Sequence, residues 1–276
     1  ASQLEGVLQA RKRFLRVNTI HVGATAFLLG LLAFLLLYRN GGIAAAVWAL
    51  LAQAGLIFLL YLLPFRKDLG IRVDPAFFET QLRFGLSLEA VNFLALLANH
   101  ASSFLLHPFG IPAAAIGNYF VAKGLAEMSW GLTDSATPVL LPGISGMPPA
   151  EARATTSRAC RVLLFLQALA ALALWGAASW LLPWLLPEYT LVMSTVIVLL
   201  PGIVIGMIPK VLACYAVSVG RPLLGLWVTG SGLVAALAGA FLLIPTYGIR
   251  GAVAATALGY AAEALAALAI YCRLSG

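Results

Sequence analysis

Long apolar stretches, separated by short breaks rich in glycine and proline, are the dominant pattern along the chain. A helix needs about 20 mostly apolar residues to cross a bilayer. Eight stretches of this kind are present: 17–38, 43–63, 86–106, 113–141, 162–182, 191–219, 223–244 and 249–271. The breaks contain turn-forming sequences such as Asn40-Gly41-Gly42, which end helices. The pattern therefore predicts an all-α, polytopic membrane helix bundle with eight transmembrane helices.

Two of these stretches depart from a simple apolar run. The stretch 113–141 carries charges, and the stretch 191–219 contains Pro201 and Pro209. Proline is tolerated inside membrane helices where neighbouring groups satisfy the freed carbonyl. We therefore expect these prolines to bend the helix rather than end it.

The composition is that of a membrane protein. Of the 276 residues, 62% are hydrophobic and 10% charged, whereas soluble domains are about half apolar and a quarter charged. A water-soluble globular protein is therefore excluded. The hydrophobicity also excludes a disordered chain, and three cysteines are too few for a disulfide-stapled one. The net charge of +7 reports membrane topology rather than nucleic-acid binding.

The basic residues divide unevenly between the two ends of the expected helices. Thirteen lie on one side: Arg11, Lys12, Arg13, Arg16, Arg66, Lys67, Arg72, Arg83, Arg153, Arg158, Arg161, Arg221 and Arg273. The other side carries only Arg39 and Arg250. Because positively charged loops stay in the cytoplasm, both ends of the chain are expected on the cytoplasmic side.

An internal repeat relates the first expected helix pair to the last. Residues 23–54 align without gaps with residues 230–261, and nine of the 32 pairs are identical, including Gly41/Gly248. Convergent helix-turn-helix composition is the alternative explanation. Both pairs run in the same direction and the period spans six helices, which favours two six-helix lobes related by an axis along the membrane normal.

On this interpretation, residues 1–74 comprise the last two helices of a first lobe and the cytoplasmic loop between the lobes. Residues 75–276 then comprise a complete second lobe of six helices. The chain also begins at Ala1 rather than Met. We therefore expect the sequence to be a fragment of a longer transporter.

A stripe of polar and aromatic residues follows the fourth expected helix. Its members are Tyr119, Lys123, Glu127, Trp130 and Asp134, spaced to share one face of an α-helix. Since charges rarely face lipid, this stripe is expected to line a water-filled lumen. There Lys123 would meet an anion, and Glu127 or Asp134 would tune it or take up a coupling ion. The alternative is a Lys123–Glu127 ion pair that only holds helices together.

Other expected helices also contain polar residues. Asn92, Asn99 and His100 lie on or beside one face of the third helix, where asparagines either line the lumen or bond neighbouring helices. Lys210 either lines the lumen or extends to the cytoplasmic surface. Glu263 is either buried and neutral or a proton-linked carboxyl that takes part in coupling.

The last expected helix also carries Gly251, Ala255 and Gly259 at four-residue spacing, which is typical of close helix packing in membranes. The histidines and cysteines have no partners at metal-ligand spacing. We therefore expect neither a metal site nor a cofactor.

Six short segments carry a resemblance to a known family. They are RFGLSL (83–88), IGNYFVAKGLAE (116–127), PVLLPGIS (138–145), LLPG (199–202), VGRP (219–222) and LIPTYGIRGAVAATALGY (243–260). In this order they resemble the C-terminal two-thirds of a polysaccharide flippase of the Wzx type. That family belongs to the MATE-like superfamily of multidrug, oligosaccharidyl-lipid and polysaccharide exporters.

The resemblance implies two six-helix lobes around a cationic central cavity in the bacterial inner membrane, with Lys123 and Lys210 as candidate ligands. The implied substrate is an oligosaccharide on undecaprenyl pyrophosphate, moved to the periplasmic leaflet by alternating access. Membrane lipid and other polysaccharide-assembly proteins are the implied partners. Related chains commonly carry an acid where this one reads Asn99-His100-Ala101, so the role of that acid does not carry over.

Two other functions are alternatives to the flippase. A MATE-type drug or metabolite exporter needs an acidic and aromatic cavity because its usual substrates are cations, and the fourth helix carries charges of both signs. A membrane-embedded glycan polymerase needs a sizeable external loop, whereas the longest external stretch is only 182–190. We therefore expect no enzyme activity.

The predicted topology is testable by cysteine labelling. In a chain whose three native cysteines are replaced by alanine, a cysteine at Gly41 should react with an impermeant maleimide added outside the cell. A cysteine at Arg221 should react only after the membrane is opened, because that loop is expected in the cytoplasm. Labelling of the Gly41 position from the cytoplasmic side alone would show that the topology is reversed.

Overall fold

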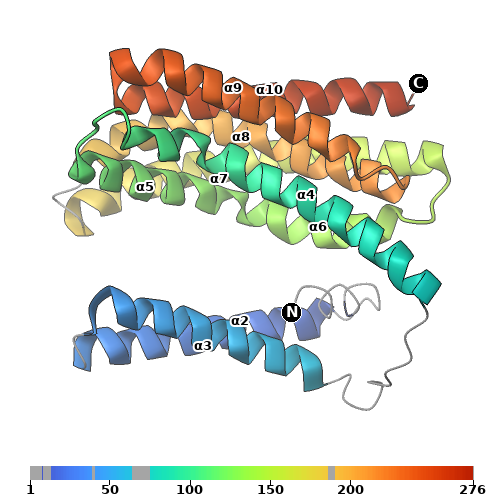
Figure 1. The fold of residues 1–276 in the computed structure, drawn as a ribbon, viewed down its shortest axis with the longest axis horizontal. Helices are drawn as coiled ribbons and strands as arrows, with labels where there is room; N and C mark the ends of the chain where they lie inside the picture. The colour runs from blue at the N-terminus through green and yellow to red at the C-terminus, as the bar shows by residue number, and fades with distance from the viewer. Residues whose placement is uncertain (1–7, 9–13, 39–40, 64–74, 186–189, 276) are drawn as a thin grey trace. The chain divides into compact units, whose positions relative to one another are not determined.

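The computed structural model describes residues 8, 14–38, 41–63, 75–185 and 190–275, and every regular element in these ranges is helical (Figure 1). The elements are α2 (Phe14–Ala33), the π-helix η1 (Phe34–Tyr38), α3 (Gly42–Leu62), α4 (Pro75–Leu106), α5 (Ala113–Glu127), the 3-10 helix η3 (Met128–Trp130), α6 (Gly131–Ile144), α7 (Pro149–Leu185), α8 (Thr190–Ser218), α9 (Leu224–Tyr247) and α10 (Ile249–Ser275). Over the described residues, the all-α fold and the eight expected helices are confirmed, while the crossing of a membrane by all eight stays a prediction. η1 continues α2, and η3 divides the fourth expected helix into α5 and α6.

Six helices, judged over the described residues, are long and apolar enough to cross a membrane: α2 with η1, α3, α7, α8, α9 and α10. The chain is therefore a multi-pass membrane protein. α4 is not among the six, and neither are α5 and α6, which as separate helices of 15 and 14 residues are each shorter than a span of about 20 residues.

Prolines do not break the helices in which they lie. α8 continues through Pro201 and Pro209, as predicted. α9 continues through Pro245 and ends at Tyr247, beyond the expected end at Ile244. The chain reverses instead at Gly248, where φ is 58°, a conformation that glycine adopts without steric cost.

The chain divides into two compact units, Ala1–Pro75 and Ala76–Gly276. The first unit is a helical hairpin in which Val17 of α2 and Tyr61 of α3 are buried in one cluster. The Tyr61 hydroxyl lies 3.0 Å from Nε2 of His21. The expected inter-lobe loop lies outside the described residues. So do seven of the basic residues used for the topology: Arg11, Lys12, Arg13, Arg39, Arg66, Lys67 and Arg72.

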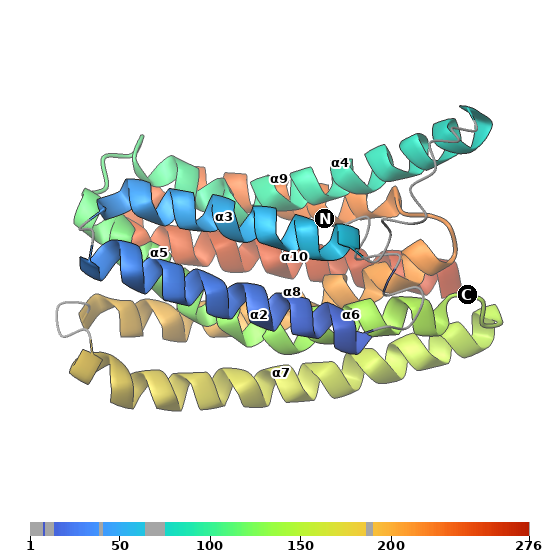
Figure 2. The same ribbon diagram turned by 90° about the horizontal axis from the view of Figure 1, so that it is seen from below.

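In the second unit, α8 packs against four other helices, α5, α6, α7 and α10. Its buried side chains recur every three or four positions, at Val192, Val196, Leu199, Ile203, Met207 and Val211. Figures 1 and 2 show the α6–α7 and α8–α9 connections and the C-terminus at one end of this unit. Arg153, Arg221 and Arg273 belong to these segments, so they share that end, while Arg250 follows the α9–α10 turn at the other.

α9 and α10 pack closely along the small residues that the sequence assigned to helix packing. A side-chain carbon on Gly251 would lie 2.1 Å from the carbonyl oxygen of Leu243. One on Gly239 would lie 3.1 Å from Cα of Ala255. Close backbone approach of this kind lets van der Waals contacts hold two membrane helices together.

We therefore expect Gly251→Val to destabilise the second unit. The added carbons meet the backbone of α9, and overpacking of this kind costs about 1–3 kcal/mol. Thermal unfolding of the purified protein in detergent should show a lower midpoint. Gly176→Ala in α7 is the matched control, because a side-chain carbon there meets nothing within 4 Å. Equal midpoints for the two variants would contradict the close packing.

Candidate functional site

The ten candidate residues lie on six elements of the second unit. They are Asn92, Asn99 and His100 on α4, Tyr119, Lys123 and Glu127 on α5, Trp130 on η3, Asp134 on α6, Lys210 on α8 and Glu263 on α10. The polar stripe predicted for one continuous helix is interrupted by η3. Three residues wound at about 120° each, rather than about 100°, turn the following helix by about 60° more. Asp134 therefore lies on α6, a separate helix from α5, which carries Lys123 and Glu127.

Asp134 pairs with Lys210 of α8. The Lys210 ammonium lies 2.7 Å from Oδ1 of Asp134 and 3.9 Å from the centre of the Trp130 ring. A carboxylate and an aromatic face thus hold the same cation. Trp130 is fixed in turn, because its indole N–H donates a hydrogen bond of 2.8 Å to the carbonyl of Ile203.

Lys123 forms the second ion pair, which is the pair that the sequence offered as an alternative to a lumen. Its side chain is only 3% exposed, and its ammonium lies 3.6 Å from Oε1 of Glu127 and also donates to the carbonyl of Asn99. Glu127 accepts a hydrogen bond of 3.4 Å from the hydroxyl of Tyr260.

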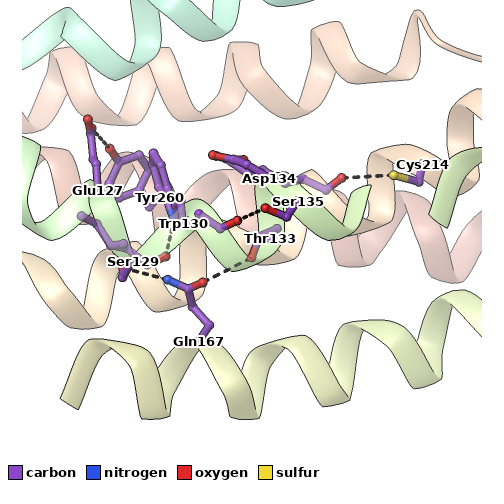
Figure 3. Close-up of polar contacts among 12 residues, drawn as sticks. Glu127, Ser129, Trp130, Thr133, Asp134, Ser135, Gln167, Cys214 and Tyr260 are labelled. Atoms are coloured by element: carbon purple, nitrogen blue, oxygen red, sulfur yellow. Dashed lines mark hydrogen bonds and ion pairs between the residues drawn. The ribbon is translucent and has the colours of Figure 1, made fainter. Parts of the chain in front are cut away.

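Two aromatic rings connect the ion pairs. Tyr260 packs edge-on against Trp130, with 5.4 Å between the ring centres. Figure 3 shows Glu127 directed toward Tyr260, with Trp130 beside it. One connected network therefore runs from Asn99 on α4 through Lys123, Glu127 and the two rings to Lys210 and Asp134.

A cavity of about 290 Å³ lies beside this network, lined by α4, η3, α8, α9 and α10. Its walls are mostly apolar, and five candidate residues line it: Asn92, Asn99, Trp130, Lys210 and Glu263. Along α10 the lining continues as far as Leu274, toward the end of the unit that carries Arg273. Apolar walls with a few polar groups are typical of sites for small or amphiphilic ligands.

Glu263 extends the packing stripe of α10 to the cavity wall. It follows Gly251, Ala255 and Gly259 at four-residue spacing. Its side chain lies against Gly232 of α9, where an added side-chain carbon would be 2.2 Å from Cγ of Glu263. A carboxyl group thus ends the line of small residues and borders the cavity.

The other five candidates are not among the residues that line the cavity: His100, Tyr119, Lys123, Glu127 and Asp134. Tyr119 is buried, and its hydroxyl lies 3.0 Å from that of Thr256, which also bonds Ser102 of α4. His100 lies beside the ring of Phe104. Among the described residues, no three His, Cys, Asp or Glu side chains are grouped to hold a metal ion.

Polar side chains are also exposed on α4 and α6, which are not among the six candidate spans. Glu89 and Asn92 of α4 are exposed, and 58% of the Asp134 side chain is exposed on α6. Lys210 is 32% exposed. Lys210 contacts Asp134 and also lines the cavity.

The sequence pattern assigned no role to two residues of this region, Tyr260 and Gln167. Tyr260 lies in a segment that carries the family resemblance, but no periodicity distinguishes it. Gln167 is the one polar side chain between Val162 and Leu174. An isolated amide in an apolar run indicates a hydrogen bond to a neighbouring helix, so the sequence could have predicted its role. Gln167 is buried and hydrogen-bonds Ser129 and Thr133 (Figure 3).

Comparisons with known proteins agree with these features. Residues 2–195 match the family described as "Polysaccharide biosynthesis protein". The fold is similar to a crystal structure of a mutant of the Vibrio cholerae MATE transporter VcmN, with a TM-score of 0.77 and 18% sequence identity over 97% of this chain. The chain spans 64% of the length of that transporter. No curated protein matches the chain significantly.

Proposed function

The chain belongs to the family of polysaccharide biosynthesis proteins, and we propose that it is part of a flippase for a lipid-linked oligosaccharide. In this proposal the substrate is an oligosaccharide on undecaprenyl pyrophosphate. The transporter moves it from the cytoplasmic to the periplasmic leaflet of a bacterial inner membrane by alternating access. No bond in the substrate is made or broken.

The exposed carboxylates of Glu89 on α4 and Asp134 on α6 are the observation that carries this proposal. Charged side chains that face lipid are costly, yet Glu89 and Asp134 are exposed. These residues lie on α4 and α6, which are not among the six candidate spans. Water in a transport lumen solvates such side chains, so we assign Glu89 and Asp134 to the lumen.

We assign residues 1–74 to the end of one lobe and residues 75–276 to a second lobe. The division into compact units at Pro75 supports this boundary, and so does the repeat between residues 23–54 and 230–261. At its turn the repeat is offset by one residue, because the positive-φ glycine of the first hairpin is Gly42 rather than Gly41. In this assignment all eight helices cross the membrane, with both ends of the chain in the cytoplasm.

The two lysines are the proposed ligands of the pyrophosphate. Lys210 lines the cavity, and the charge of its ammonium is balanced by Asp134. An incoming phosphate competes with this carboxylate for the same ammonium. Glu127, Asp134 and Glu263 are the proposed groups that take up a coupling ion once the lysines bind substrate. Surrounding lipid and other polysaccharide-assembly proteins are the proposed partners.

A drug or metabolite exporter is the second candidate, and the cavity itself favours it. The lining includes four aromatic residues, Trp130, Tyr215, Tyr260 and Tyr271, together with the carboxyl of Glu263. Aromatic faces next to an acid suit organic cations. Transport of such cations, with no effect of the chain on surface glycan, would favour this candidate over the flippase.

Lys123→Ala in the full-length transporter is expected to lower surface glycan export about tenfold or more, because the substrate loses one cationic ligand and Glu127 loses its partner. Export should be measured by glycan staining of intact cells and divided by the amount of folded transporter in the membrane. Export at the wild-type level would remove Lys123 from the proposed lumen.

Exchange of the two charges tests whether the Lys210–Asp134 pair acts through the lysine or only through packing. Lys210→Asp and Asp134→Lys should each lower both the unfolding temperature and export. The double exchange restores an ion pair, so it should recover the unfolding temperature without recovering export. Arg221→Ala, outside the site, is the control. Full recovery of export in the double exchange would show that the pair is only structural.

A further inference from the structure

Gln167 of α7 is buried in the apolar interior of the second unit and has no part in the function proposed above. Its side-chain amide bridges Ser129, within η3, and Thr133, in the first turn of α6. Nε2 donates to the hydroxyl of Ser129 at 2.8 Å, and Oε1 accepts from the hydroxyl of Thr133 at 3.2 Å. Both partners are buried as well, so the amide spans the turn without contact with solvent.

The bridge is centred on the place where the α5–α6 segment changes its winding. The Ser129 hydroxyl, which accepts from Gln167, also donates to the carbonyl of Ala126 at 2.8 Å. The residues before, within and after the 3-10 turn are therefore joined to one side chain of a neighbouring helix. In Figure 3 Gln167 lies below the turn, between Ser129 and Thr133.

The opposite side of the same turn carries the transport site. Trp130 extends from η3 to bond the carbonyl of Ile203, and the Lys210 ammonium rests on its ring. Gly206 leaves no spare room there, because an added side-chain carbon would lie 3.2 Å from the Trp130 ring. A small rotation of the turn would therefore move Trp130 and Asp134 relative to Lys210.

We infer that Gln167 is a positioning residue: it holds the 3-10 turn so that Trp130 and Asp134 face Lys210. The inference rests on the proposed function for its consequence in transport, and on the contacts of the turn for its geometry. An apolar residue of similar size would fill the same space, but it would leave the hydroxyls of Ser129 and Thr133 without this partner. The Thr133 hydroxyl would then be free to bond the backbone of its own helix, as the Ser129 hydroxyl already bonds the carbonyl of Ala126, and such bonds favour a different winding of the segment.

Amide hydrogen exchange of the full chain tests the geometric part, because it needs no substrate. In Gln167→Leu and Thr133→Val, amides of residues 128–134 should exchange roughly threefold to tenfold faster than in the wild type, as expected for the loss of an interhelical hydrogen bond. Thr133→Ser keeps the hydroxyl and should exchange at the wild-type rate. Ser179→Ala, on the same helix, is the control, since its hydroxyl bonds only the carbonyl of Trp175.

Export measured per folded molecule tests the positioning role. Gln167→Leu and Thr133→Val should lower export about threefold to tenfold, and Thr133→Ser should retain it. In a Trp130→Phe background, Gln167→Leu should cause little further loss, because both changes act on the same contact to Lys210. A purely structural glutamine would instead lower the unfolding temperature and leave export per folded molecule unchanged.

Each outcome decides the inference. Unchanged exchange over residues 128–134, or losses of export that multiply in the Trp130→Phe background, would overturn it. If Gln167→Leu does not fold, Thr133→Val and Thr133→Ser provide the same comparison. If substitutions of Lys210 leave export unaffected, the proposed function fails, whereas faster exchange in Thr133→Val would still establish that Gln167 holds the turn.

Discussion

Two lysines inside a bundle of apolar helices set the constraint on which the second unit depends. An ammonium group taken out of water must be paired and hydrogen-bonded, or its burial is strongly unfavourable. Lys123 meets this requirement with Glu127, one turn along α5, and with a carbonyl of α4. Lys210 of α8, which is less buried at 32% exposed, pairs with Asp134 of α6. The Lys123 ammonium therefore connects α5 to α4, and the Lys210 ammonium connects α8 to α6.

Pairing at these distances requires helices that approach closely, and glycine on α8 makes the approach possible. A side-chain carbon on Gly202 would lie 3.0 Å from Cβ of Ala257, and one on Gly206 would lie 3.3 Å from the Tyr260 ring. α10 therefore packs directly onto α8, and the rings of Tyr260 and Trp130 occupy the space that side chains on α8 would fill. The aromatic connection between the ion pairs depends on these missing side chains.

The helices were predictable from the sequence, because hydropathy and turn residues report local properties of the chain. The continuity of α8 through its prolines and the small-residue seam of α10 followed from the same local reasoning. The interruption at Met128–Trp130 did not follow from it; in the structure, Gln167 of another helix bonds Ser129 within this turn and Thr133 beyond it. α-Helical spacing alone therefore placed Asp134 on the face of Lys123. Its actual partner, Lys210, is 76 positions away, and only the packing of α6 on α8 brings the two together.

The pairing of Lys210 also bears on which ligands the proposed site can select. Its ammonium already lies 2.7 Å from a carboxylate, so an anion of the same charge that replaced Asp134 would gain little. A group with more than one negative charge, such as pyrophosphate, gains more from the same ammonium. Asp134 is 58% exposed, so its carboxylate can return to solvent at little cost when it is displaced. The same carboxylate then competes for the ammonium and repels the bound anion, which favours release. A lysine that is paired before substrate arrives can thus combine selectivity for a multiply charged group with a means of letting it go.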